Sequence, residues 1–240
     1  WGEFEKWASK SVKPSAGLRF LKDSGWLAHF PELEALVGCP QDPVWHPEGD
    51  VWQHTCQVVD QAAGKGIVVV LAALCHDMGK PETTSKNPEG RWVSPGHNNP
   101  AAAQSFLARI GCPASIAGQV LELVENHMVH LNEVTPRTVR RLLARLKHAS
   151  VDDLLTVIEA DHSGRYPLPG GLPENAKRIG EIALEMGNKI EPILQGRHLI
   201  EMGMKPGKHF GEVLKKAFEA QIEGDFSCPE TGKRWIDRVS

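Results

Sequence analysis

The sequence predicts an all-α fold, a helical bundle with short flanking helical segments. Three observations support this: apolar residues recur at helical spacing along most of the chain, helix start and stop signals bracket those stretches, and strand signals are few. The 240 residues are 41% hydrophobic, enough for a substantial core. No apolar run approaches 18 residues, so we expect no membrane span.

Short helices are expected over residues 1–38, followed by a loop rich in Pro and Gly. Asp50 is a good N-cap for a helix from Val51 to Ala63, which would stop before Gly64. Residues 67–70 are β-branched, and the run 67–71 on its own would suggest a buried strand. We predict a helix there, because the neighbouring segments are helical and the following residues favour helix.

A long polar loop is expected over 81–97, followed by helices near 100–110 and 113–130. The next helix, 137–148, carries a basic face that is either a solvated surface or a track for an RNA backbone. Ser150 should cap a helix that reaches about His162. Further along, helices are predicted over 174–186 and 211–223, with a turn at 199–207 between them.

This order of elements divides the chain into three segments. We expect an N-terminal helical brace over 1–40, a main domain over 41–166, and a C-terminal helical segment over 167–240, joined by a Pro/Gly linker.

Charge and cysteines restrict the class of protein. The net charge of −3 is not typical of a generic nucleic-acid binder, so any RNA contact must use a local basic face. The five cysteines form no C-x-x-C pair, which argues against a disulfide framework and a thiolate zinc site. The first residues are not typical of a signal peptide. Together these features predict a cytoplasmic protein.

The most informative stretch is the apolar run that ends in His76-Asp77. Adjacent imidazole and carboxylate groups at the end of a buried segment offer two ligands to a divalent metal ion. Lys80 would add a mobile positive charge about one turn later, a natural partner for a phosphate. Such a dipeptide is common by chance, so its weight depends on further ligands elsewhere in the chain.

Further ligands of suitable type do occur, at or near predicted helix ends, where a rigid backbone can fix coordination geometry. A set without thiolate suits Ni, Co, Mn, Mg, Fe or Zn, as one ion or as two bridged by a carboxylate. The candidate metal ligands are His54, His76, Asp77, His97, His127 and Asp161.

This ordered set resembles the HD-domain phosphohydrolase superfamily. The stretches 45–55, 73–81 and 203–224, together with 1–38, look more specifically like bacterial multifunctional CCA-adding enzymes, the tRNA nucleotidyltransferases. The Gly-Ser and D-x-D motifs of that family's catalytic head have no counterpart here, so we do not expect CCA addition by this chain alone. The resemblance implies an HD-domain bundle and metal-dependent phosphohydrolysis: 2′,3′-cyclic phosphodiesterase, 2′-nucleotidase or phosphatase action.

Roles follow from this chemistry. Asp77 is the candidate to orient the attacking water or accept its proton, Lys80 to hold a phosphoryl oxygen, and Arg165 to do so as a weaker second cation. The expected substrate is a nucleotide or an RNA 3′ end, including that of tRNA. Three tryptophans, at 45, 52 and 92, can stack on a base, although we expect two of them in the core.

Other functions remain open. The chain can be a non-catalytic tRNA-binding body that partners a separate nucleotidyltransferase head, or a regulatory nucleotide-binding module that retains the metal. Within the enzyme class, a small-molecule nucleotidase is the second choice. A full set of metal ligands argues against a mere scaffold.

Overall fold

A computed structural model describes residues 1–239, and the fold is mostly helical, as predicted. The described elements are α1 (Gly2–Lys10), α2 (Pro14–Asp23), η1 (Trp26–His29), α3 (Pro31–Glu34), α4 (Val51–Gln61), α5 (Ile67–Cys75), α6 (Lys80–Thr83), β1 (Ser85–Lys86), β2 (Trp92–Val93), α7 (Ala101–Arg109), α8 (Ala114–Asn126), η2 (Val129–Leu131), α9 (Pro136–Arg145), α10 (Val151–Ser163), α11 (Glu174–Glu185), α12 (Gly196–Glu201), α13 (His209–Glu223) and α14 (Pro229–Val239). None of these helices is long and apolar enough to cross a membrane.

The described chain divides into two compact units. Unit 1 comprises residues 1–132 and 146–180, and unit 2 comprises residues 133–145 and those from 181 onward. Unit 2 thus includes a short segment that lies between two parts of unit 1 in the sequence. The expected segments 1–40, 41–166 and 167–240 remain a prediction.

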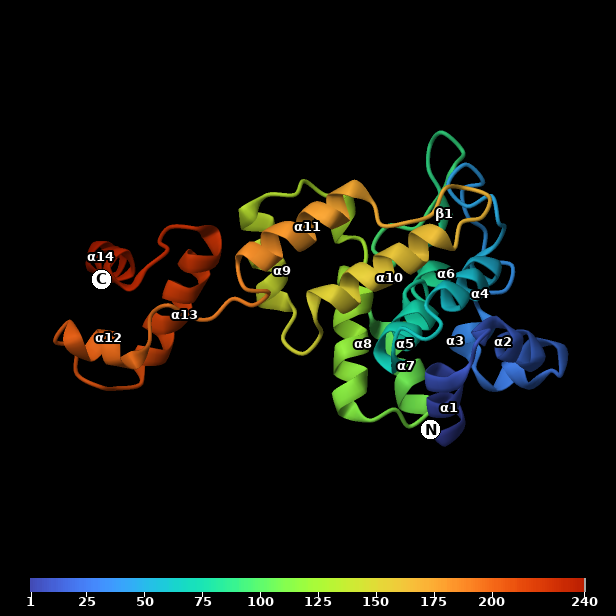
Figure 1. Cartoon of the computed structure of the whole chain (residues 1–240), viewed down its shortest axis with the longest axis horizontal. Helices are drawn as coiled ribbons and strands as arrows, with labels where there is room; N and C mark the ends of the chain where they lie inside the picture. Colours follow the sequence, from blue (N-terminus) through green and yellow to red (C-terminus); the bar gives the residue numbers. More distant parts are fainter. Residues whose placement is uncertain (240) are drawn as a thin grey trace. The chain divides into compact units, whose positions relative to one another are not determined.

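The core of unit 1 is built around α5, which packs against α4, α8 and α10 (Figure 1). All its residues from Val69 to Cys75 are buried, so this helix is apolar on every side. The predicted helix over this β-branched stretch is confirmed. Burial in a helical bundle overrides the strand preference of the valines, because local propensities differ little in free energy and tertiary packing then determines the structure.

Two predicted N-caps are confirmed. The Asp50 carboxylate accepts a hydrogen bond from the backbone N–H of Gln53 at 2.9 Å, and Ser150 Oγ accepts one from that of Asp153 at 3.0 Å. Each satisfies an N–H group that the first turn leaves without a helical partner. These two caps fix where α4 and α10 begin.

Two expectations about loops were wrong. The polar stretch 81–97 contains the antiparallel pair β1–β2, which closes through a turn where the Asn87 side chain accepts the Arg91 N–H and Gly90 has φ +76°. The expected turn at 199–207 begins within α12, where the Gln195 backbone N–H donates to His198 Nδ1. A histidine in this capping role is not a usual helix-start signal, so α12 was not predicted from the sequence.

Unit 2 has its own core, formed by Leu199 of α12, Ala217 of α13, Ile236 of α14 and their apolar neighbours. Helix α9 packs against α13 within this unit. Arg137 and Arg141 both pair with Glu223, and Arg140 Nε donates to the Ile222 carbonyl at 2.8 Å. This part of the predicted basic face is therefore bound to α13 rather than simply solvated.

Glu122 provides a test of the packing in unit 1. Its carboxylate accepts the backbone N–H groups of His148 and Ala149, both at 2.9 Å, and lies 2.7 Å from His148 Nδ1. Burial opposes ionisation, but these bonds outweigh it and hold the pKa of Glu122 below its usual value of 4.5.

We expect Glu122→Gln to lower the free energy of unfolding by about 1–2 kcal/mol at pH 7, measured by urea unfolding. Because the folded pKa is depressed, this stabilisation is present above the unfolded pKa and disappears as pH falls through the folded one. The difference between the variant and the parent should therefore shrink in acid. A constant difference down to pH 3 would contradict the assignment.

Candidate metal centre

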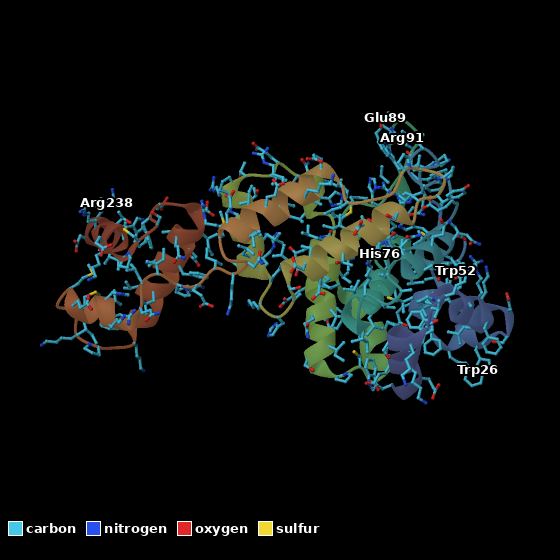
Figure 2. All side chains as sticks on the ribbon, in the orientation of Figure 1. Trp26, Trp52, His76, Glu89, Arg91 and Arg238 are labelled. Atoms are coloured by element: carbon cyan, nitrogen blue, oxygen red, sulfur yellow. The ribbon has the colours of Figure 1, made fainter. Side chains whose placement is uncertain are left out.

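His76 and Asp77 follow directly on α5, whose apolar surface carries them into the interior of unit 1. Only 1% of His76 and 2% of Asp77 is exposed, and Figure 2 shows His76 among the helices of the unit. Two polar side chains at such depth are costly to bury unless they have partners.

Those partners come from separate elements of the same unit. His54 is on α4, Asp161 is near the end of α10, His127 directly follows α8, and His97 lies in the loop before α7. His54, His97 and His127 are all buried. The structure thus brings together every predicted metal ligand; their assignment as ligands remains a prediction.

The ligand atoms lie close enough to share an ion. His54 Nε2 is 3.1 Å from Asp161 Oδ1 and 3.3 Å from His76 Nε2. Asp77 faces both sides: its Oδ2 is 3.3 Å from His76 Nε2 and its Oδ1 is 3.5 Å from His97 Nε2. A carboxylate with each oxygen turned to a different imidazole group offers one oxygen atom to each side of the cluster.

The imidazole rings are held with Nε2 toward this cluster. His76, His97 and His127 each place Nδ1 at hydrogen-bond distance from a backbone carbonyl, that of Ala73 (2.8 Å), Ser94 (2.6 Å) and Val124 (2.7 Å) respectively. A carbonyl only accepts, so the proton sits on Nδ1 and the lone pair on Nε2. Among the described residues, buried His127 Nε2 has no hydrogen-bond partner. Such orientation is typical of metal-ligating histidines.

The charges in the cluster favour a cation. Burial opposes ionisation of Asp77 and Asp161, but His76 and Lys80 beside Asp77, and His54 beside Asp161, hold both carboxyl pKa values well below the usual range. Burial lowers the pKa of His127 to about 3, so this imidazole is neutral near pH 7. Ionised carboxylates and neutral imidazoles are the forms that bind metal ions.

His54 differs from the other imidazoles. Burial favours its neutral form, but Asp161 and Glu48 outweigh burial and raise the pKa of His54 to about 9. A proton on His54 and a metal ion at its Nε2 are mutually exclusive, so metal binding there must release that proton.

Close backbone contacts set the positions of two ligands. A Cβ at Gly79 would lie 2.2 Å from the His97 carbonyl oxygen, so only glycine lets the turn after Asp77 reach this loop. A Cβ at Gly164 would lie 2.5 Å from Val58 Cγ2, so glycine also lets the end of α10 approach α4. The second contact keeps Asp161 near His54.

Lys80 is not the mobile charge that the sequence suggested. It is buried, with Nζ 2.6 Å from Asp77 Oδ2 and 2.6 Å from Gln41 Oε1. Because Asp77 and Lys80 lie on consecutive turns, the ammonium reaches back to the carboxylate. Arg165 lies nearby at the same cavity, with its Nε 3.5 Å from the His162 carbonyl.

A cavity of about 660 Å³ opens onto this cluster. Asp77, His97, His127 and Asp161 contribute to its wall, as does Lys80. The volume is that of a small-molecule site.

Aromatic side chains complete the wall. Trp45 and Trp92 line the cavity, and Trp45 is 57% exposed, whereas Trp52 is only 1% exposed in the core. The expectation that two of the three tryptophans are core residues was wrong. Sequence reasoning also assigned no role to Gln41 or Glu48, both of which contact site residues. Their only signal was proximity to His46 and His54 in the sequence.

Together, fold and site define a helical protein with a buried histidine–carboxylate cluster that can hold a metal ion. No family model matches the chain. It is a homologue of bacterial CCA-related proteins, to which it is similar over most of its length. The multifunctional CCA protein of Laribacter hongkongensis is 36% identical over 180 residues, which are 69% of this chain and 42% of the relative.

Two other relatives cover more of the chain. The multifunctional CCA protein of Aliivibrio salmonicida is 30% identical over 92% of this chain and 54% of its own length. The CC-adding tRNA nucleotidyltransferase of Thermus thermophilus is 31% identical over 94% of this chain and 53% of its own length. The chain therefore spans about half the length of the curated relatives that it matches.

Gly79→Ala tests the close contact that positions His97. The added methyl group must push the His97 backbone away, and we expect a loss of about 1–3 kcal/mol in the free energy of unfolding, measured by urea unfolding. Gly118→Ala in α8 is the matched control, because its Cβ meets no atom within 4 Å. It should be neutral or stabilising. Equal stability of the Gly79 variant and the parent protein would show that the contact is not restrictive.

Proposed function

We propose that this chain is a metal-dependent phosphohydrolase that acts on nucleotides or RNA ends, as a 2′,3′-cyclic phosphodiesterase, 2′-nucleotidase or phosphatase. The observation that carries the proposal is the convergence of imidazole and carboxylate groups from five places in the sequence beside one cavity. The homologues have names that refer to CCA and to tRNA, which favours an RNA 3′ end among the substrates. A tRNA-processing role in the cytoplasm is part of this proposal.

The donor set fits a divalent metal ion. His54, His76, Asp77 and Asp161 would hold one ion, and His97 with His127 would hold a second through the other oxygen of Asp77. Ni, Co, Mn, Mg, Fe and Zn all suit such ligands. When bound, the metal supplies an activated water nucleophile and offsets the charge of the phosphoryl group.

Asp77 is the residue that orients the attacking water or accepts its proton. Lys80 Nζ lies 2.6 Å from its Oδ2, which also faces His76, and its Oδ1 faces His97. The lysine keeps Asp77 ionised and fixes its direction, which a general base requires.

Two cations at the cavity can bind the phosphoryl group. An ammonium has three N–H donors. Lys80 donates one to Gln41 Oε1 and forms an ion pair with Asp77 Oδ2, so a donor is left for a phosphoryl oxygen. Arg165 has further guanidinium donors beyond its contact with His162. Trp45 and Trp92 offer flat apolar surfaces in the same wall for a nucleobase.

The direct test is hydrolysis of 2′,3′-cyclic AMP by metal-stripped protein that is resupplied in turn with Ni, Co, Mn and Mg. We expect metal-dependent turnover in the parent protein and a loss of about 100-fold or more in His76→Ala and Asp77→Ala. Asp152→Asn, an exposed change in the first turn of α10, is the control and should retain full activity. Circular dichroism should show that all variants remain helical.

The same experiment separates the alternatives. Activity in Asp77→Ala at full metal loading would refute the assigned role. If the ion binds but no phosphate ester is cleaved, the chain is better described as a tRNA-binding body or a regulatory module, and tRNA titration would follow. Competition between mononucleotides and an RNA with a 2′,3′-cyclic end tells a small-molecule nucleotidase from an enzyme for RNA ends.

Arg165→Met tests the phosphate-binding role. Loss of a charge-assisted hydrogen bond costs about 1.5–3 kcal/mol, so we expect KM for 2′,3′-cyclic AMP to rise about tenfold or more, with a smaller change in kcat. Arg165→Lys should recover part of the affinity, because it restores the charge without the fork of donors. An unchanged KM in the methionine variant would remove Arg165 from the substrate site.

A further inference from the structure

Glu48 is a buried carboxylate that the proposed function does not use. Its side chain is fully buried, and its Oε1 lies 2.7 Å from His54 Nδ1 and 2.9 Å from His46 Nδ1. A buried carboxylate is costly unless charged or polar partners compensate. Both of these partners are imidazole groups, and one of them belongs to the metal cluster.

The local chain conformation directs Glu48 toward His54. Asp50 caps α4 through one carboxylate oxygen and accepts the Gly38 N–H at 2.7 Å through the other, so the loop before α4 is tied at its end. Gly49 has φ +121°, a conformation that favours glycine. This turn places Glu48 beside the first turn of α4, where His54 lies.

His46 contacts the same carboxylate oxygen as His54. Its Nδ1 contacts Glu48 Oε1, and its ring packs edge-on against that of His54, with centroids 4.7 Å apart and an interplanar angle of 77°. The three side chains therefore form one packed group, and His54 Nε2 is the atom through which it contacts the metal cluster.

His54 is distinguished from the other imidazoles of the cluster by this acceptor. His76, His97 and His127 place Nδ1 at neutral backbone carbonyls, whereas His54 places Nδ1 at a carboxylate. A negative charge 2.7 Å from Nδ1 stabilises positive charge on the imidazole and makes the lone pair on Nε2 a better electron donor. The two sides of Asp77 are thus chemically unequal.

Building on the proposed metal centre, we propose that Glu48 is a positioning residue that orients His54 and strengthens it as a ligand. This makes the side formed by His54, His76, Asp77 and Asp161 the higher-affinity metal site. His97 and His127, on the other side of Asp77, have no such carboxylate behind them among the described contacts. The first ion should therefore bind on the His54 side.

The test is a titration of the metal-stripped full chain with Co²⁺, followed by the visible absorption bands of the bound ion. In Glu48→Gln, which keeps the size of the side chain but removes its charge, we expect the Kd of the first Co²⁺ to rise about 10–100-fold. Glu48→Asp keeps the charge at a shorter reach, and its Kd should lie between those of the parent and the glutamine variant.

Glu122→Gln is a matched control. Glu122 also contacts a histidine Nδ1 at 2.7 Å, but its partner His148 is not part of the cluster. The same chemical change there should leave Co²⁺ affinity unchanged. Thermal unfolding of each metal-stripped variant shows whether it is folded. If Glu48→Gln is not folded, Glu48→Asp is the deciding variant, and its Kd for Co²⁺ must exceed that of the parent.

Equal Kd values for the first Co²⁺ in parent and Glu48→Gln would overturn the inference, as would a loss confined to a second, weaker ion. These outcomes are distinct from failure of the proposed function. A parent protein that binds Co²⁺ through a Glu48-dependent site but cleaves no phosphate ester would refute the hydrolase and leave the positioning role standing.

Discussion

Electrostatic crowding at the end of α5 is the constraint on which unit 1 depends. Asp77 lies there among closely packed imidazole groups, with only 3.3 Å between His54 Nε2 and His76 Nε2. Such a cluster of buried carboxylates is unfavourable unless positive charge compensates it. Burial of the hydrophobic surface of α5 offsets this unfavourable free energy and holds the polar end of the helix in place.

Within the protein, Lys80 and a protonated His54 are the positive charges that meet the two carboxylates. They form two pairs, Lys80 with Asp77 and His54 with Asp161. Lys80 contacts Asp77 Oδ2, the oxygen that also faces His76. A divalent ion held by His54 would replace the proton on that imidazole. The two positive charges thus balance the two carboxylates, and release of the His54 proton would change this balance when a metal ion binds.

Much of the fold could be predicted because its signals are local. Asp50 is an N-cap residue that predicts the start of α4, and Ser150 predicts the start of α10 in the same way. The ligands could be proposed because the His and Asp residues occur in an order that resembles the HD-domain pattern. The positions of Lys80 and Glu48 could not be predicted, because their partners depend on how a loop folds over a helix. Charged residues are usually exposed, and the sequence does not distinguish a buried one.

The insertion of α9 between two parts of unit 1 has a consequence for any chain cut near residue 180. Such a cut removes α13 but leaves α9 in the larger fragment. Helix α9 would lose its packing against α13, and Arg137 and Arg141 would lose Glu223. The truncated fragment would expose a new apolar and cationic surface. Binding of polyanions to that surface would result from the truncation and would not be a property of the native molecule.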